Sequence, residues 1–134
     1  MSNWNENIIK EFRENKGKVS GKFDNVTLAL LHTIGAKSGE TRINPLICLP
    51  DANRYLVVAS KGGASTHPDW YHNILANPNV TVEFGTNKFG ATAIPAEEPE
   101  RTDLYTKMET FFNGFNEYKT MTKRVIPVVV LQPK

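Results

Sequence analysis

The sequence predicts an α+β fold that is mainly β, with about six mostly antiparallel strands in a small closed or half-closed barrel and helices at its periphery. Two observations support this prediction. Short apolar or alternating runs follow one another across brief turns rich in glycine, proline and asparagine, as in hairpins. Helical patterns occur only at the start, in the middle and before the last strand, whereas a doubly wound sheet needs regular alternation of strands and helices. A small antiparallel barrel accommodates this order.

The length and the composition are those of an ordinary globular protein. A length of 134 residues favours a single domain over residues 1–134. The net charge of +2 is too small to indicate a nucleic-acid partner. No apolar stretch approaches the ~20 residues that span a bilayer, and no signal peptide is visible, so we expect a cytoplasmic protein. The one cysteine, Cys48, lies in an apolar run and predicts a buried thiol.

Residues 3–15 predict an amphipathic helix that ends near Gly17. Apolar residues recur there at helical spacing between charged ones: Trp4, Ile8, Ile9 and Phe12. This face would pack on the barrel or on a second subunit of a homodimer. The alternative is a weak, peripheral association with a membrane surface.

The first two strands are predicted at 26–33 and 42–49, joined as a hairpin by a turn with two glycines. Pro45 lies inside the second strand, so that strand should form an edge or carry a bulge. A turn at 50–53 leads to a third strand at 54–60.

A glycine loop and a helix follow the third strand, over residues 59–77. Gly62 and Gly63 permit positive φ angles, and Lys61 adds a charge beside them. Thr66 is the predicted N-cap, and Asp69 places a negative charge in the first helical turn. The backbone N–H groups of such a loop suit an anion or the polar edge of a cofactor, although a plain strand-to-helix connection would look similar.

The remaining elements complete the barrel. Strands are predicted at 80–84 and 88–95, then a helix that opens at 97–100 and carries an apolar face of Leu104, Met108, Phe111 and Phe112. Asn113-Gly114 interrupts this helix, and a short helical piece follows with Phe115, Tyr118 and Met121. The last strand, 125–131, is almost wholly apolar, which predicts burial on both faces.

Several chemistries have no motif in this sequence. Neither a dinucleotide-binding glycine pattern nor a Walker loop is present, and no G-x-S-x-G elbow occurs. His67 and His72 are five residues apart and no cysteine or carboxylate pair joins them, so no metal site is expected. Cations, glycines and aromatic side chains remain, and this set suits an anionic, flat cofactor.

Five segments together resemble the deazaflavin-dependent nitroreductase family. They are IGAKSGETRINPL at 34–46, VVASKGGA at 57–64, PDWYHN at 68–73, ANPNV at 76–80 and RVIPVVV at 124–130. The similarity covers most of residues 26–131, with the motifs in the family's order.

The resemblance implies a split β-barrel that binds coenzyme F420, a deazaflavin, and passes a hydride to an electron-poor acceptor such as a quinone, an enone or a nitro compound. Ser60 and Tyr118 are the candidates for hydrogen bonding to the acceptor. Carried over by position, the cofactor contacts would be Lys37, Ser38, Arg42, Ile43, Asn44, Pro45, Leu46, Ile47, Val58, Ala59, Ser60, Lys61, Gly62, Gly63, Asp69, Trp70, Tyr71, His72, Asn73 and Phe115.

The chain departs from the family pattern at three positions. Ala36 stands where the family's turn usually has arginine, and Phe112 and Phe115 match positions that are tyrosines in the nitroreductase branch. Two other functions therefore stay open, namely a non-catalytic carrier of F420, a flavin or a lipid, and a split barrel that binds FMN.

Overall fold

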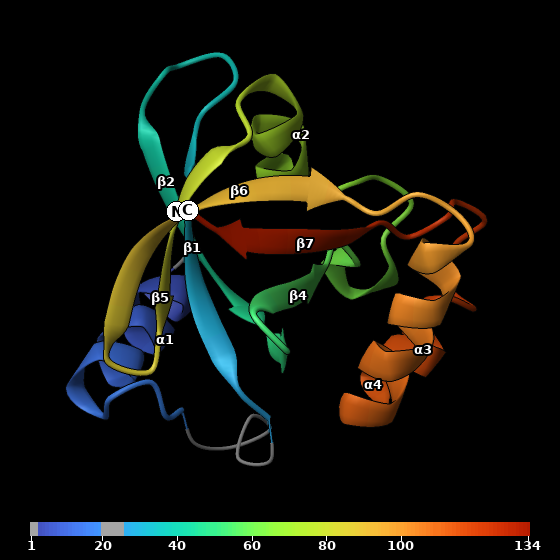
Figure 1. Ribbon diagram of the computed structural model, residues 1–134, viewed down its shortest axis with the longest axis horizontal. Helices are drawn as coiled ribbons and strands as arrows, with labels where there is room; N and C mark the ends of the chain where they lie inside the picture. Colours follow the sequence, from blue (N-terminus) through green and yellow to red (C-terminus); the bar gives the residue numbers. More distant parts are fainter. Residues whose placement is uncertain (1–2, 20–25) are drawn as a thin grey trace.

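The computed structural model describes residues 3–19 and 26–134, and its centre is one curled, fully antiparallel sheet (Figure 1). Within the described residues the sheet has seven strands in the order β2-β1-β5-β6-β7-β4-β3. Their bounds are β1 Leu28–Ile34, β2 Thr41–Ile47, β3 Leu49–Asp51, β4 Arg54–Val58, β5 Asn79–Phe84, β6 Asn87–Pro95 and β7 Val128–Pro133. The predicted mainly β class is confirmed.

The sheet curls until strands from its two ends meet. β2 contacts β4, although four other strands lie between them in the hydrogen-bonded order. Because the ladder does not close between β2 and β4, the fold is a split barrel rather than a continuous one. This meeting of the two ends positions the site described below.

Two central strands bury both of their faces. In β4, Val57 packs into the barrel interior while Leu56 faces the opposite layer, and in β7 Leu131 and Val130 alternate in the same way. The alternation follows from the pleat, which turns successive side chains to opposite faces. The prediction of a doubly buried last strand is confirmed, but the strand begins at Val128, and Val125 lies outside it with 64% of its surface exposed.

The first hairpin forms as predicted, with small shifts in its boundaries. Pro45 pairs with Leu30, and β2 is an edge strand, so the missing N–H of the proline breaks no ladder on the outer side. The sequence reading missed β3, which it assigned to a turn, because a three-residue strand is too short to show a period. Cys48, just before β3, is fully buried in the barrel core, and burial raises the pKa of its thiol.

The N-terminal helix α1 (Asn3–Glu14) packs on the outside of β1 and β2. Ile8 and Phe12 are buried there against Leu28 and Leu30, which confirms the packing of this helix on the barrel. The side chain of Trp4 lies outside the described residues.

Helix α2 (Asp69–Ala76) begins later than the sequence suggested. Pro68 is its N-cap residue, and the predicted cap Thr66 instead accepts a hydrogen bond from the Lys61 ammonium at 3.3 Å. The proline explains the shift, because its ring disfavours helical backbone angles at the residue before it.

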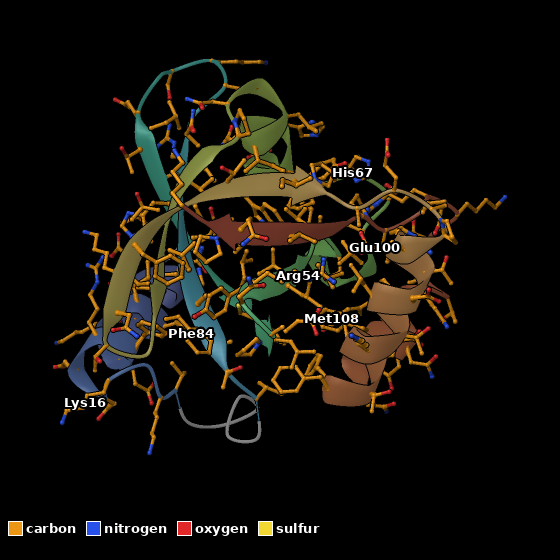
Figure 2. All side chains as sticks on the ribbon, in the orientation of Figure 1. Lys16, Arg54, His67, Phe84, Glu100 and Met108 are labelled. Carbon is orange, nitrogen blue, oxygen red and sulfur yellow. The ribbon has the colours of Figure 1, made fainter. Side chains whose placement is uncertain are left out.

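Helices α3 (Glu100–Phe111) and α4 (Gly114–Tyr118) cover the sheet face opposite the barrel interior. Met108 lies fully buried on the side of α3 that is turned to the sheet (Figure 2). Gly114 separates the two helices as predicted, since a Cβ there would lie 2.3 Å from the Phe112 ring. Met121, predicted to lie in the short helical piece, follows the end of α4 and is 65% exposed. Among the described residues, no helix is both long enough and apolar enough to cross a bilayer.

Candidate active site

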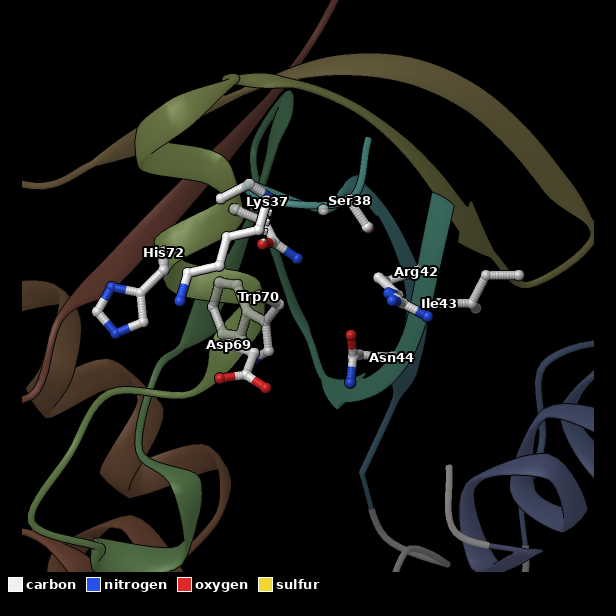
Figure 3. Close-up of a pocket in the computed structure, with 11 residues that line it drawn as sticks. Lys37, Ser38, Arg42, Ile43, Asn44, Asp69, Trp70 and His72 are labelled. Atoms are coloured by element: carbon white, nitrogen blue, oxygen red, sulfur yellow. Dashed lines mark hydrogen bonds between the residues drawn. The ribbon is translucent and has the colours of Figure 1, made fainter. Parts of the chain in front are cut away.

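Two adjoining cavities lie where the curled sheet brings β2 next to β4 and α2. The larger cavity has a volume of about 750 Å³ and the smaller one about 380 Å³. Asn44 on β2 and Trp70 on α2 line both cavities, so one elongated ligand can occupy the two together. Figure 3 shows the larger cavity between side chains of β2 and side chains of α2, with the turn before β2 above them.

Most of the predicted cofactor contacts line one of these cavities. Those in the larger cavity are Lys37, Ser38, Arg42, Ile43, Asn44, Asp69, Trp70, His72 and Asn73. The smaller cavity adds Pro45, Leu46, Ile47, Val58, Ser60, Lys61, Gly62, Phe115 and Tyr118. The structure thus brings together residues from three of the five motifs and from the segment 115–118.

The wall of the larger cavity offers two exposed cations. The Lys37 ammonium pairs with no described carboxylate, and Arg42 has only a loose, exposed ion pair with Glu40 at 3.4 Å. Asp69 contributes one opposing charge to the same wall. Cations that are free of strong internal partners suit phosphate or carboxylate ligands.

Asn73 supports the wall of the larger cavity from within the protein. Its Oδ1 accepts the Ala36 N–H at 3.0 Å, and its Nδ2 donates to Thr33 Oγ1 at 3.1 Å. Since Asn73 is 7% exposed and Thr33 is fully buried, these bonds fix the turn after β1 against α2. Asn73 therefore holds the turn in addition to lining the cavity.

The smaller cavity is lined mainly by apolar and aromatic side chains. Leu46 and Ile47 come from β2, Val58 from β4 and Phe115 from α4. Helix α1 also reaches this cavity through Asn5 and Ile8, a contribution that the sequence reading missed because nothing in the helical pattern indicates which strand it covers.

Two hydroxyl groups enter this apolar cavity. The side chains of Ser60 and Tyr118 both line it, and neither hydroxyl hydrogen bonds to another residue in the described ranges. Ser60 is only 7% exposed, so its hydroxyl is shielded from bulk water. Such hydroxyls are available to a bound acceptor.

The loop between β4 and α2 contains a 3₁₀ turn, η2 (Lys61–Gly63), with three successive positive φ angles. Gly63 needs to be glycine, because a Cβ would lie 2.9 Å from Met121 Cβ and 3.1 Å from the Tyr118 carbonyl oxygen. Lys61 has a φ of 49°, which is strained for a residue with a side chain.

Three comparisons place this geometry among known proteins. Residues 4–133 match the family model of the F420H(2)-dependent quinone reductases. This chain belongs to that family. An F420H(2)-dependent quinone reductase of Mycobacterium tuberculosis (strain ATCC 25618 / H37Rv) is 44% identical over 105 residues, which cover 76% of this chain and 70% of that protein.

Solved structures agree with the family in fold. The structure of an F420-H2 dependent reductase, FDR-A, matches with a TM-score of 0.73 and 39% identity, over 78% of this chain and 93% of that one. A structure described as a domain-swapped dimer matches with a TM-score of 0.75 and 32% identity, over 97% and 98% of the two chains. The predicted resemblance is confirmed, and with it a split-barrel oxidoreductase whose cofactor is coenzyme F420.

The residues present fit this cofactor. Coenzyme F420 joins a flat deazaflavin ring to a phosphate and an acidic glutamate tail, and the two cavities offer an apolar and a cationic surface that meet at Trp70. When bound in its reduced form, the cofactor supplies a hydride.

Three predicted contacts line neither cavity. Ala59 is fully buried, and its carbonyl oxygen accepts a hydrogen bond from Arg124. Gly63 packs against Met121, and Tyr71 packs against the His67 ring, with centroids 4.9 Å apart. Burial raises the pKa of Tyr71 above its ordinary value.

Arg124 is a residue beside the site whose contacts the sequence did not predict. Its guanidinium donates to the carbonyl oxygens of Ala59, Ser60 and Ala64, at 3.2, 2.8 and 2.9 Å. It lies within the last of the motifs that carry the family resemblance, but a lone arginine beside an apolar strand reads as a surface charge, and its partners are about sixty residues away in the chain.

Proposed function

We propose that this family member reduces quinones, with the deazaflavin ring and the acceptor in the smaller cavity and the cofactor tail in the larger one. The observation that carries the proposal is the pair of adjoining cavities, of which the larger has Lys37 and Arg42 in its wall and the smaller has more aliphatic and aromatic side chains. The names of the relatives support a quinone as acceptor, and an apolar cavity favours a flat, weakly polar acceptor over a small polar metabolite.

The larger cavity would hold the anionic groups. Lys37, on the turn before β2, and Arg42, on β2, lie on opposite sides of the larger cavity, so both could approach an anion that is bound between them (Figure 3). Charge-assisted hydrogen bonds of this kind are roughly twice as strong as neutral ones. Ser38 and the N-terminal turn of α2 would add polar contacts.

The smaller cavity would orient the ring and the acceptor. Trp70 and Phe115 offer flat surfaces, while Ser60 and Tyr118 would donate to the acceptor oxygen on which negative charge develops. A quinone needs a proton as well as a hydride to become a hydroquinone, and Tyr118 is the proposed donor. The surrounding apolar side chains would exclude water from the reacting atoms.

A binding and turnover experiment tests this proposal. Calorimetric titration with F420, and with FMN in parallel, should show tight binding of F420 and weak binding of FMN. The rise in absorbance of the oxidised deazaflavin, followed with a quinone and with a nitroaromatic compound as acceptor, should be faster with the quinone. Preference for FMN, or a faster nitro acceptor, would contradict the proposal, and binding without turnover would favour the carrier function.

Variants of the two hydroxyl residues define the site. Removing a donor to a developing oxyanion costs about 10²–10³-fold in kcat, so Tyr118→Phe and Ser60→Ala should each reduce quinone turnover while F420 still binds. Tyr55→Phe is the matched control, since Tyr55 packs on Phe84 and Phe89 in the barrel interior. An equal reduction of kcat in Tyr55→Phe and Tyr118→Phe would show that Tyr118 is not the proton donor.

Assembly and location are part of the same proposal. The similarity to a domain-swapped dimer supports a homodimer, which light scattering on the purified chain would detect. The single domain over 1–134, a cytoplasmic location and a weak membrane-surface association of α1 stay predictions. Sedimentation with anionic vesicles tests the last, and the burial of Ile8 and Phe12 leaves α1 little apolar surface for lipid.

A further inference from the structure

The Arg124 guanidinium makes four hydrogen bonds, all to the segment that joins β4 to α2. Besides three backbone carbonyl oxygens, it contacts His67, with Nη1 of the arginine 2.9 Å from Nδ1 of the histidine. The planar arrangement of the guanidinium N–H groups suits several acceptors in one plane, which a lysine ammonium does not reproduce. One side chain thereby fixes both ends of the loop that carries Ser60 and Lys61.

The contact with Arg124 determines the protonation state of His67. Arginine stays charged and has only donors, so Nδ1 of His67 must be the acceptor. Nδ1 therefore carries no proton, and the ring is neutral with its proton on Nε2. A protonated His67 would turn an N–H toward the N–H of Arg124.

The other neighbours of His67 also disfavour its positive charge. The Tyr71 ring lies 4.9 Å away and the His72 ring 5.9 Å away, both on α2. From the loop before β7 the neighbour is Arg124, and no carboxylate of the described residues pairs with His67. Burial, then the charge of Arg124 and then His72 lower the pKa of His67 below its ordinary value.

The position of the Arg124–His67 contact links it to the proposed reaction. Figure 2 places His67 at the end of the sheet away from α1, where the β4–α2 connection passes. The carbonyl oxygens that Arg124 holds belong to Ala59, Ser60 and Ala64, which bracket η2. Release of Arg124 from His67 would loosen the backbone that aims the Ser60 hydroxyl and the Lys61 ammonium at the smaller cavity.

We propose that Arg124 is a positioning residue for the Ser60–Lys61 loop, that its hold requires neutral His67, and that acidification releases the loop and weakens cofactor binding. The weakening of cofactor binding rests on the proposed function, because it needs F420 to contact this loop. The release of the loop by acidification concerns the free protein alone. Loss of one hydrogen bond to a charged group corresponds to about a ten-fold change in affinity, or more.

The test compares the wild type with His67→Asn across pH. An asparagine Oδ1 lies near the position of the histidine Nδ1 and accepts from Arg124, but it does not titrate. Calorimetric F420 affinity of the wild type should fall about ten-fold more than that of the variant between pH 7.5 and pH 5. Any pH dependence that comes from the cofactor or from other residues is shared by both proteins, so the difference isolates His67. In the His72→Asn background the same difference should remain.

A readout without cofactor keeps the two proposals separate. Nitrogen NMR of the free protein should show His67 at pH 7.5 as the neutral tautomer with the proton on Nε2, and amide exchange of residues 60–64 should speed up as His67 titrates. A charged His67 at pH 7.5 would overturn the proposed hold of Arg124 on the loop. So would equal amide exchange of the loop in the wild type and His67→Asn at a pH where the NMR spectrum shows His67 to be charged. If NMR shows neutral His67 at pH 7.5 and faster loop exchange as His67 becomes charged, but F420 binds at neither pH, the assignment of the cavities to F420 is wrong. The proposed hold of Arg124 on the loop is then still supported.

Arg124→Lys provides a second, independent measurement. The lysine keeps the charge but cannot satisfy four acceptors, so F420 affinity should fall about ten-fold at pH 7.5 and its extra pH dependence should disappear. Unfolding by urea measures the global stability of the same protein. A loss of stability with unchanged affinity and an unchanged pH profile would show Arg124 to be structural only.

Discussion

Ala36 is the residue at which this chain most clearly differs from its family. It is exposed on the wall of the larger cavity, and its N–H is held by Asn73, so its side chain position is fixed while its volume is small. Ala36→Arg should therefore place a third cation beside Lys37 and Arg42 and tighten F420 binding by about ten-fold, the lower limit for a charge-assisted hydrogen bond at an exposed site.

Calorimetric titration at two salt concentrations measures this gain. Ala36→Gln is the matched control, because it has similar reach without charge. The arginine gain should shrink at high salt, since exposed charges are screened. Equal affinities of the two variants would show that the tail does not pass this wall.

Lys61 combines a useful charge with an unfavourable backbone conformation. Its φ of 49° lies in the left-handed region, which costs a residue with a Cβ roughly 1–2 kcal/mol. Lys61→Gly should relieve this strain and raise the free energy of unfolding by about 1 kcal/mol, while F420 binding weakens because the ammonium is lost.

Urea denaturation of Lys61→Gly measures the expected gain in stability, and F420 titration of the same variant measures the expected loss of affinity. Lys61→Ala is the control, because it removes the charge and keeps the strain. If Lys61→Gly is no more stable than Lys61→Ala, the strain does not contribute. The position would then be explained by the loop's other contacts, such as the hydrogen bond to Thr66.

At the scale of elements, helix α1 is attached to the sheet by a charge cluster as well as by its apolar face. Glu83 on β5 accepts hydrogen bonds from Arg13 at 2.7 Å and from His32 at 2.6 Å. These contacts, the one with Arg13 first, lower the pKa of Glu83. Because the folded-state pKa is depressed, the stabilisation is present above the unfolded-state pKa and disappears as pH falls through the folded-state pKa.

Glu83→Gln should therefore reduce stability at pH 7 by about 1 kcal/mol, a small figure because Arg13 is half exposed. The gap between the two proteins should shrink as pH falls below the ordinary pKa of glutamate and close below the lowered folded-state pKa of Glu83, where the side chain is protonated and resembles glutamine. Urea denaturation at a series of pH values from 7 downward gives this comparison. A gap that persists after Glu83 is protonated in the folded protein would mean that shape, and not charge, holds α1.

At the scale of the molecule, the site exists only because the sheet curls. Four strands separate β2 from β4 in the hydrogen-bonded order, so core packing far from the cavities determines the spacing of the two walls that these strands form. Leu131→Ala in β7 removes a fully buried side chain of the barrel core and should cost about 2–5 kcal/mol.

Ligand binding should offset most of that loss. F420 at 100 times its Kd stabilises the folded form by about 2.7 kcal/mol if it binds only the folded form. Thermal unfolding of Leu131→Ala with and without F420 measures the recovery. A variant that stays folded but shows no shift with F420 would indicate that its two walls no longer meet.

Much of this architecture was predictable because it depends on local patterns. The period-two alternation around Val80 and the apolar run at 128–131 indicated strands, and Pro45 correctly indicated an edge. The role of Arg124 was not predictable, because its acceptors are backbone carbonyl oxygens, which every residue has. The contribution of Asn5 to the smaller cavity was not predictable either, because only the curl of the sheet brings α1 to that cavity.

The burial of Cys48 has a further meaning if the acceptor is the quinone proposed above. Quinones are electrophiles that add to thiolates, so an accessible, ionised cysteine beside such an acceptor would be arylated. Cys48 is the one cysteine of the chain, is fully buried and has a raised pKa, so both access to its sulfur and its ionisation are suppressed. Under that proposal, the fold would keep this thiol from being modified during turnover.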